Sequence, residues 1–173
     1  QMALQRKDRA RVITELEKLL QHAHTDLDSA RLLARQLEDS GAPPARLIPA
    51  YERIAQLDPF NAANHTLLGR LKLQGGDART AAREFRATLA SGSLDPAAAH
   101  SDLAESYLAL GDKVQARRAI LAAIEVAPGY PRAQDLQQAV RGDGQQVALG
   151  VVALDVGHRP AAGDAGRQLT HLR

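Results

Sequence analysis

Apolar residues near the start of the chain recur at three- and four-residue intervals, the spacing that places them on one face of an α-helix. The first segment with this spacing covers 11–22, where we expect a helix. The residues on its apolar face are Leu16, Leu19 and Leu20. Apolar stretches separated by short polar turns continue to about residue 140. The pattern therefore predicts a chain of consecutive helices.

Glycine, aspartate and proline mark the expected turns. Gly76-Asp77 and Gly111-Asp112 each combine a residue that tolerates left-handed backbone geometry with a side chain that can cap the next helix. Proline ends a helix because its ring clashes with the preceding turn, yet it is tolerated in a first turn. We therefore expect one helix to stop and the next to start at Asp58-Pro59, Asp95-Pro96 and Ala127-Pro128.

These turns belong to an internal repeat of about 34 residues. Small residues stand where we expect paired helices to approach closely, at Gly69, Ala81, Ala104 and Ala116. Larger residues are expected to fill the gaps between units, at Tyr51, Phe85 and Ile120. We predict a repeat domain over 1–141, with units at about 27–61, 62–96 and 97–130, a partial repeat at 8–26 and a capping helix at 131–141.

The composition supports helices and excludes several kinds of chemistry. Apolar residues make up 45% of the chain and aromatic residues only 3%, so the core must consist mainly of alanine and leucine. Such a core favours helices over a sandwich or barrel. The absence of cysteine excludes a thiol nucleophile, a disulfide framework, an iron–sulfur cluster and a thiolate zinc site. The net charge of +2 gives no reason to expect a polyanion as partner.

The repeat resembles the tetratricopeptide repeat (TPR) over roughly 16–140. The unit at 97–130 matches the family pattern in register, at Leu103, Ala104, Tyr107, Gly111, Ala116, Ile120, Ala123 and Pro128. The preceding unit matches it at Leu68, Gly69, Gly76-Asp77, Ala81 and Phe85. The resemblance implies an all-α, right-handed α-solenoid of antiparallel helix pairs. It also implies a protein–protein interaction module, a scaffold or adaptor that binds a partner peptide or helix in a concave groove.

In this family the first helix of each unit lines the groove, and the resemblance carries that role onto a set of positions in this chain. They are Arg31, Arg35, Thr66, Arg70, Gln74, Ser101, Glu105 and Leu108, with Asp28, Ala63 and Ala109 beside them. A guanidinium can hold a carboxylate with two hydrogen bonds. An acidic segment or a C-terminal carboxylate is therefore the ligand expected for Arg31, Arg35 and Arg70.

A simpler interpretation of the arginines stays open. They can be solvated surface charges, with Asp28, Glu38 or Asp39 close enough along the helix to pair with them. The family's clamp for chaperone tails needs cations in the third unit, where this chain has Ser101 and Glu105. We therefore do not expect a chaperone tail as the ligand.

Motifs for catalysis, metal binding and nucleotide binding are missing. The sequence has no His-Glu-x-x-His, no Gly-x-Ser-x-Gly and no Gly-rich phosphate loop, so we expect neither an enzyme nor a cofactor. His22 and His24 leave a metal site at a helix end as a minor alternative. His65 and His100 recur at one repeat position, which indicates a structural role. Nucleic acid is not expected as a partner, because few aromatic residues accompany Arg79, Arg83, Arg86, Arg117 and Arg118.

A second function class also stays open. The half repeat at the start suggests a non-catalytic tail of a larger bacterial enzyme or envelope-assembly protein, acting within that protein. No stretch reaches the roughly 20 apolar residues that span a bilayer, and the chain has no signal-peptide pattern, so cytoplasm and periplasm both remain open. We expect the glycine-rich 142–173 to be mostly irregular, although 147–156 could form a short strand. Exposed repeat ends could also allow oligomers.

Overall fold

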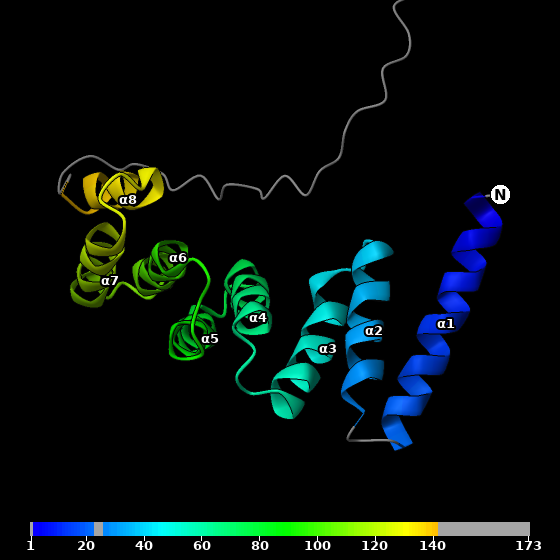
Figure 1. The fold of residues 1–173 in the computed structure, drawn as a ribbon. Coiled ribbons are helices and arrows are strands. Elements are labelled where there is room, and N and C mark those ends of the chain that lie inside the picture. The colour runs from blue at the N-terminus through cyan, green and yellow to red at the C-terminus, as the bar shows by residue number, and fades with distance from the viewer. Residues whose placement is uncertain (1, 23–25, 142–173) are drawn as a thin grey trace, which may run out of the picture. The chain divides into compact units, whose positions relative to one another are not determined.

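The computed structural model describes residues 2–22 and 26–141, and all secondary structure in these ranges is helical (Figure 1). Eight α-helices follow one another in the described residues. They are α1 (Met2–His22), α2 (Leu27–Asp39), α3 (Pro44–Leu57), α4 (Ala62–Gln74), α5 (Ala78–Ala90), α6 (Pro96–Ala109), α7 (Lys113–Val126) and α8 (Pro131–Arg141). The predictions for 142–173, including a strand at 147–156, concern residues outside the described part.

The turns inside the helix pairs have the predicted chemistry. Gly76 and Gly111 have φ angles of 83° and 75°, a left-handed geometry that glycine adopts without steric cost. Asp77 caps α5 by accepting a hydrogen bond from the Thr80 backbone N–H at 3.0 Å. Asp112 caps α7 by accepting one from the Gln115 N–H, also at 3.0 Å. The glycine–aspartate pairs therefore both end one helix and start the next.

The proline positions were predicted only in part. Pro96 opens α6, and Asp95 caps that helix by accepting from the Ala98 N–H at 2.9 Å. However, α5 already ends at Ala90, before a glycine at position 92 whose φ is 81°. Pro59 and Pro128 lie in turns, and the proline that starts α8 is Pro131. The prolines therefore lie in turns or in first helical turns, but they do not coincide with each helix end.

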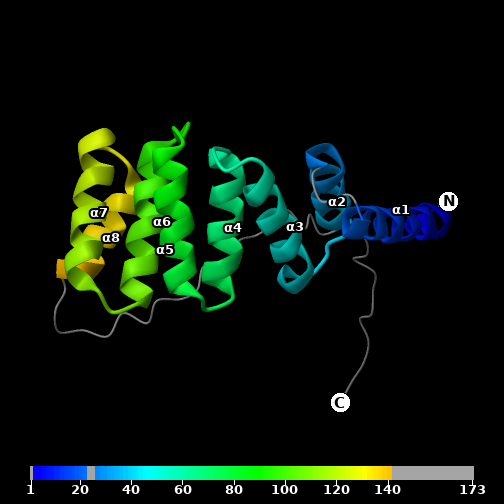
Figure 2. The same cartoon turned by 90° about the horizontal axis from the view of Figure 1, so that it is seen from below.

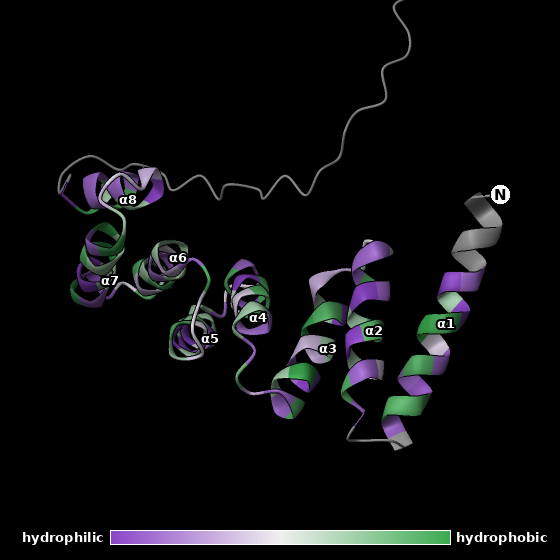
Figure 3. Ribbon diagram, viewed as in Figure 1, coloured by the Kyte–Doolittle hydropathy of each residue, from purple (hydrophilic) through white to green (hydrophobic). Residues whose placement is uncertain are grey.

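Each helix packs mainly against its neighbours in sequence, as in an α-solenoid of antiparallel pairs. The helix α6 contacts both α4 and α8, so the first helices of successive pairs also touch one another. A view from below shows α4 to α8 as one continuous set of packed helices (Figure 2). Most helices carry both apolar and polar residues around their circumference (Figure 3), as helices that bury one side require.

The small and large residues singled out by the repeat are buried together. Ala81, Phe85, Ala104 and Ile120 lie in one hydrophobic cluster built from α5 to α8. Gly69 faces Phe85 so closely that a Cβ atom at position 69 would lie only 2.7 Å from the Phe85 Cε1 atom. The close approach of paired helices is therefore confirmed at this position, and it depends on the missing side chain.

Two features of α1 differ from the expectation. The helix begins at Met2, well before the predicted start at residue 11. Leu16 and Leu20 are buried as predicted, but Leu19 is 45% exposed. Neither α2, against which α1 packs, nor α3, whose arginines reach Glu17 and Leu20, covers Leu19. None of the helices in the described part of the chain is both long and apolar enough to cross a membrane.

Candidate functional site

The predicted groove residues lie on α2, α4 and α6, the first helices of three successive pairs. Arg31 and Arg35 are one turn apart on α2 and are both exposed. Arg31 donates a hydrogen bond to Asp58 at 2.8 Å and lies 3.9 Å from Asp28, so part of the simpler surface-charge interpretation holds for it. Arg35 has no ion pair or side-chain hydrogen bond with the described residues. It is the most available cation among the predicted site residues.

Arg70 is held by a buried carboxylate. Its Nε and Nη2 atoms donate to one oxygen of Asp102, Oδ2, at 3.2 and 3.1 Å. Asp102 belongs to α6 and is only 2% exposed. A carboxylate that is removed from water in this way needs a cation close by, because an unpaired buried charge is strongly unfavourable. Arg70 therefore has a structural role between α4 and α6, and the prediction that it joins Arg31 and Arg35 in one anion site lacks support.

A second arginine completes this network. Arg132, near the start of α8, approaches the other oxygen of Asp102 at 2.6 Å. It also binds Glu105 with two contacts, Nε to Oε1 at 2.8 Å and Nη2 to Oε2 at 2.7 Å. Burial by itself lowers the pKa of Arg132, but the two carboxylates together raise it above its usual value. The network of Arg70, Asp102, Arg132 and Glu105 thus joins α4, α6 and α8 and is charge-neutral.

Two predicted site residues point into the structure. Ser101 is fully buried, and its hydroxyl donates to the Ala97 carbonyl at 2.9 Å. It offers no atom to a partner, so its place in the predicted groove was wrong. Thr66 is half-buried; its hydroxyl donates to the Ala62 carbonyl at 2.9 Å and lies 3.2 Å from the Thr88 hydroxyl. Helical hydroxyls often bond to the carbonyl four residues earlier in this way.

Three more predicted residues keep some exposure. Gln74 is exposed at the end of α4, and Leu108 is partly buried against the hydrophobic cluster of α5 to α8. Glu105 is also partly exposed, although Arg132 occupies both of its oxygens. The first helices therefore present Arg31, Arg35, Gln74, Leu108 and the outer side of the network.

The histidines divide in a similar way. His65 is buried, with Nδ1 at 2.8 Å from a Glu84 oxygen and Nε2 at 2.9 Å from the Pro59 carbonyl oxygen. This placement agrees with the structural role predicted for it. His100 is half-buried, and burial lowers its pKa. The side chains of His22 and His24 lie outside the described residues; among those described, no group of three His, Asp or Glu side chains could hold a metal ion.

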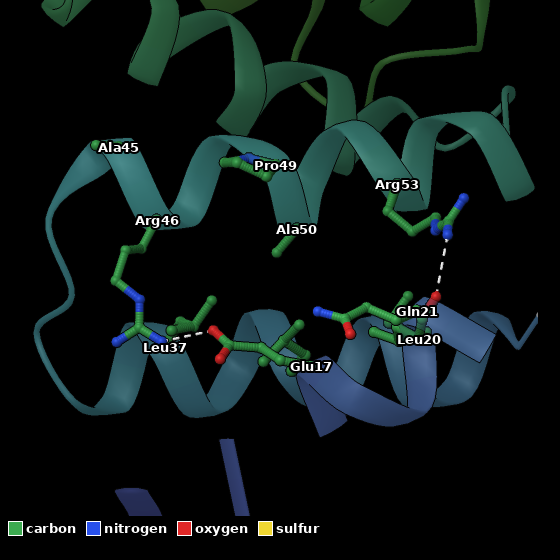
Figure 4. Close-up of a pocket in the computed structure, with 11 residues that line it drawn as sticks. Glu17, Leu20, Gln21, Leu37, Ala45, Arg46, Pro49, Ala50 and Arg53 are labelled. Carbon is green, nitrogen blue, oxygen red and sulfur yellow. Dashed lines mark hydrogen bonds and ion pairs between the residues drawn. The ribbon is translucent and has the colours of Figure 1, made fainter. Parts of the chain in front are cut away.

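A cavity of about 580 Å³ lies between α1, α2 and α3 (Figure 4). Its floor is apolar, with Leu20, Leu33 and Ala50 among its lining residues. Two arginines of α3 bridge it to α1: Arg46 reaches Glu17 at 2.5 Å, and Arg53 donates to the Leu20 carbonyl at 3.2 Å. Residues of α1, α2 and α3 together line this cavity.

Sequence reasoning missed Asp102 and Arg132. A weak signal existed for the first: Asp102 stands in α6 where the repeat places Leu67 in α4 and Leu32 in α2. The aspartate marks this position as unusual, but Leu67 and Leu32 are 40% and 44% exposed, so the sequence indicates neither the burial of Asp102 nor its partner. Arg132 could only be found once the packing of α8 on α6 was known.

The comparisons with known proteins point to one fold. No family model matches the chain, and no curated protein matches its sequence. Among solved structures, MamA is similar with a TM-score of 0.63 and 23% identity over 76% of this chain and 77% of that one. The first TPR of Spaghetti (RPAP3), bound to the HSP90 peptide SRMEEVD, has a TM-score of 0.58 and 17% identity over 69% of this chain and 95% of that one. YrrB, a TPR protein with an unusual peptide-binding site, has a TM-score of 0.60 and 17% identity over 78% of this chain and 69% of that one.

Proposed function

Since the chain has the fold of tetratricopeptide repeat proteins, we propose that it is a protein–protein interaction module that binds a segment of a partner across the first helices α2, α4 and α6. Two of the similar structures are a TPR bound to an HSP90 peptide and a TPR protein with an unusual peptide-binding site. A stack of rigid helix pairs suits this task, because each first helix adds side chains to one continuous surface.

The observation that carries the proposal is the exposed pair Arg31 and Arg35 on α2. Arg35 has no acidic partner among the described residues, and Arg31 is only partly occupied by an exposed Asp58 contact. Exposed ion pairs are worth about 0–1 kcal/mol, so a partner carboxylate can replace such a contact at little cost. An acidic segment or a terminal carboxylate of the partner is the ligand that this pair suits.

The rest of the surface supplies a different kind of contact. The network of Arg70, Asp102, Arg132 and Glu105 is internally neutralised, so it holds α4, α6 and α8 in place more than it attracts charge. Gln74 and Leu108 offer an amide and an apolar contact near it. The proposed ligand therefore has an acidic end over α2 and an uncharged part over α4 and α6.

The test is an affinity purification in which the chain is the bait and captured proteins are identified by mass spectrometry. The double variant Arg31→Glu/Arg35→Glu should lose a partner that the unmodified chain retains. The matched control is Arg79→Glu/Arg86→Glu, which reverses two exposed arginines of α5 that have no ion pair with the described residues.

The outcome is clear in both directions. Loss of the partner in the α2 variant but not in the α5 variant, with the same helical circular dichroism in both, supports binding through α2. Equal loss in both variants indicates non-specific charge attraction, and undiminished capture by the α2 variant refutes the assignment. Arg70 is left unchanged throughout. Replacing it would remove one of the cations that compensate the buried Asp102 carboxylate, and this would destabilise the fold.

A further inference from the structure

The arginine pair of α2 already meets a carboxylate of its own chain. Arg31 donates from its Nη2 atom to the Asp58 Oδ2 atom at 2.8 Å. Asp58 directly follows α3, in the turn that leads to α4. The same oxygen accepts from the Asn61 Nδ2 atom at 3.0 Å, so the carboxylate is held from two sides. An internal carboxylate therefore occupies the place that the proposed function gives to an acid of the partner.

The turn itself does not require a carboxylate at position 58. Ala127 has the same place at the end of α7: both residues precede a proline, and both donate their backbone N–H to the carbonyl four residues earlier. Their backbone angles are also alike, with φ −136° and ψ 77° at Asp58 and φ −141° and ψ 90° at Ala127. Since alanine forms this turn, the contribution of the Asp58 side chain lies in its contacts with Arg31 and Asn61.

The Arg31–Asp58 pair is exposed enough to exchange for another. The Arg31 side chain is 47% exposed and that of Asp58 is 30% exposed. An ion pair of this kind is formed only about one to five times as often as it is open. Among the described contacts, Asp58 reaches Arg31 but not Arg35, which lies one helical turn further along α2, about 6 Å away. A carboxylate from outside can lie between the two guanidinium groups and contact both, which Asp58 does not do.

The Asp58 carboxylate also connects α2 to the start of α4. Asn61, which donates to Asp58, caps α4 by accepting from the Asn64 backbone N–H at 3.0 Å. In the described part of the chain α2 does not itself pack against α4, whereas α4 packs on α6. Displacement of Asp58 from Arg31 therefore changes the surroundings of the Asn61 side-chain amide, at the first turn of α4.

Resting on the function proposed for α2, we propose that Asp58 is an internal competitor for the arginine pair. It occupies Arg31 in the free chain, and the acidic segment of a partner displaces it. A site that is open in only a fraction of the molecules binds more weakly by that fraction. With the pair formed one to five times as often as it is open, Asp58 weakens binding about two- to sixfold. Asp58 thus sets the affinity of the α2 site and links its occupation to the α3–α4 turn.

Fluorescence polarisation of a labelled peptide with the full chain tests the proposal. The probe is rhodamine-labelled Ala-Leu-Glu-Glu-Leu-Glu with a free carboxyl terminus, and the same peptide with glutamine for glutamate and an amidated end is its uncharged control. Asp58→Ala, which copies Ala127, should bind the acidic probe about two- to sixfold more tightly than the unmodified chain. In the Arg31→Gln background Asp58→Ala should give no such gain, because the competitor then has no cation to occupy.

Two further measurements separate displacement from a general loss of negative charge. Asp28 also lies near Arg31, at 3.9 Å, but its side chain is almost fully exposed, and it makes no hydrogen bond to Arg31 among the described contacts. Asp28→Asn should therefore raise the affinity for the acidic probe less than Asp58→Ala does. In the unmodified chain, NMR titration with the probe should shift the side-chain amide signal of Asn61, and this measurement needs no variant.

The results that overturn this role of Asp58 differ from those that overturn the function of α2. Circular dichroism checks the fold of every variant, and Asp58→Asn replaces Asp58→Ala if the latter does not fold. Equal, weaker or absent binding of the acidic probe by the Asp58 variant overturns the role. An equal gain in Asp28→Asn, a gain that persists without Arg31, or an Asn61 signal that does not move also overturns it. If the captured partner is nevertheless lost in Arg31→Glu/Arg35→Glu, the proposed function stands without the competitor. Undiminished capture by that variant refutes the proposed function, whatever the peptide shows.

Discussion

Replacing Gly69 by alanine should destabilise the fold, although alanine is normally the better residue in a helix. Gly69 lies in the middle of α4, facing the ring of Phe85 on α5. A Cβ atom added at position 69 would lie 2.7, 2.9 and 3.0 Å from three ring carbons of Phe85. Carbon atoms in contact prefer separations of about 3.5–4.0 Å, so the ring or the helix must move.

The size of the effect follows from two opposing contributions. Alanine gains about 1 kcal/mol over glycine in a helix interior. Overpacking a well-filled core costs about 1–3 kcal/mol, and the upper part of that range applies here because the Phe85 ring is fully buried and has no room to retreat. We therefore expect Gly69→Ala to lower the free energy of unfolding by about 1–2 kcal/mol.

The next repeat supplies the compensating change. It has Ala104 where α4 has Gly69, and Ile120 where α5 has Phe85, with both residues buried in the same cluster. The double variant Gly69→Ala/Phe85→Ile copies that combination. In the Phe85→Ile background the alanine should cost nothing or stabilise by up to about 1 kcal/mol, which gives a coupling energy of about 1–3 kcal/mol.

Urea unfolding followed by circular dichroism measures all four proteins of this cycle. Gly75→Ala is the matched control, because Gly75 has an ordinary φ of −76° and the nearest atom to an added Cβ is 3.4 Å away. It should change the stability by less than about 0.5 kcal/mol. If Gly69→Ala is as stable as the unmodified chain, or if its cost is the same in the Phe85→Ile background, the close-contact argument is wrong.

Three further predictions concern buried polar contacts and packing. Arg70→Gln/Arg132→Gln leaves Asp102 buried without a cation and should lower the free energy of unfolding, measured in urea, by about 3–5 kcal/mol. Asp102→Asn should lower it by less, because the two arginines are half-exposed and can reach water. Tyr51→Phe removes the hydrogen bond from the Tyr51 hydroxyl to Glu38 and should cost about 1–2 kcal/mol. Burial, with a smaller contribution from Glu38, raises the Tyr51 pKa above its usual 10.0, so the unmodified chain should lose stability as the pH rises beyond that value while Tyr51→Phe should lose less. Ala116→Leu places a large side chain at a fully buried position and should lower the melting temperature, at a cost of about 1–3 kcal/mol; unchanged melting would contradict the repeat register.

The repeat made much of the fold predictable from the sequence. Gly76-Asp77 and Gly111-Asp112 were recognised because left-handed geometry and N-capping are properties of single residues. The close approach at Gly69 was also predictable, since a glycine opposite a phenylalanine recurs as an alanine opposite an isoleucine one repeat later. These features depend on local chemistry and on period, both of which the sequence contains.

The candidate site was harder to predict because exposure depends on neighbours from other repeats. Arg70 has the charge and spacing of a groove residue, but the buried Asp102 on α6 holds it, and Arg132 comes from a helix two pairs away from α4. Ser101 lies one helical position before Asp102 and is buried by the same packing. Leu19 shows the reverse case: its spacing predicted a buried position, but α2 and α3 leave it 45% exposed.

The neutral network also decides where electrostatic attraction to a partner can act. Asp102 and Glu105 balance Arg70 and Arg132, so charge on α4, α6 and α8 near the network is cancelled locally. On α2, by contrast, Arg35 is exposed without such a balance, and charged groups of this kind govern encounter rates and their dependence on salt. Reversing Arg35 should therefore slow association and reduce its salt dependence. Replacing Leu108 by alanine should instead speed dissociation and leave the salt dependence unchanged, because it removes only apolar contact.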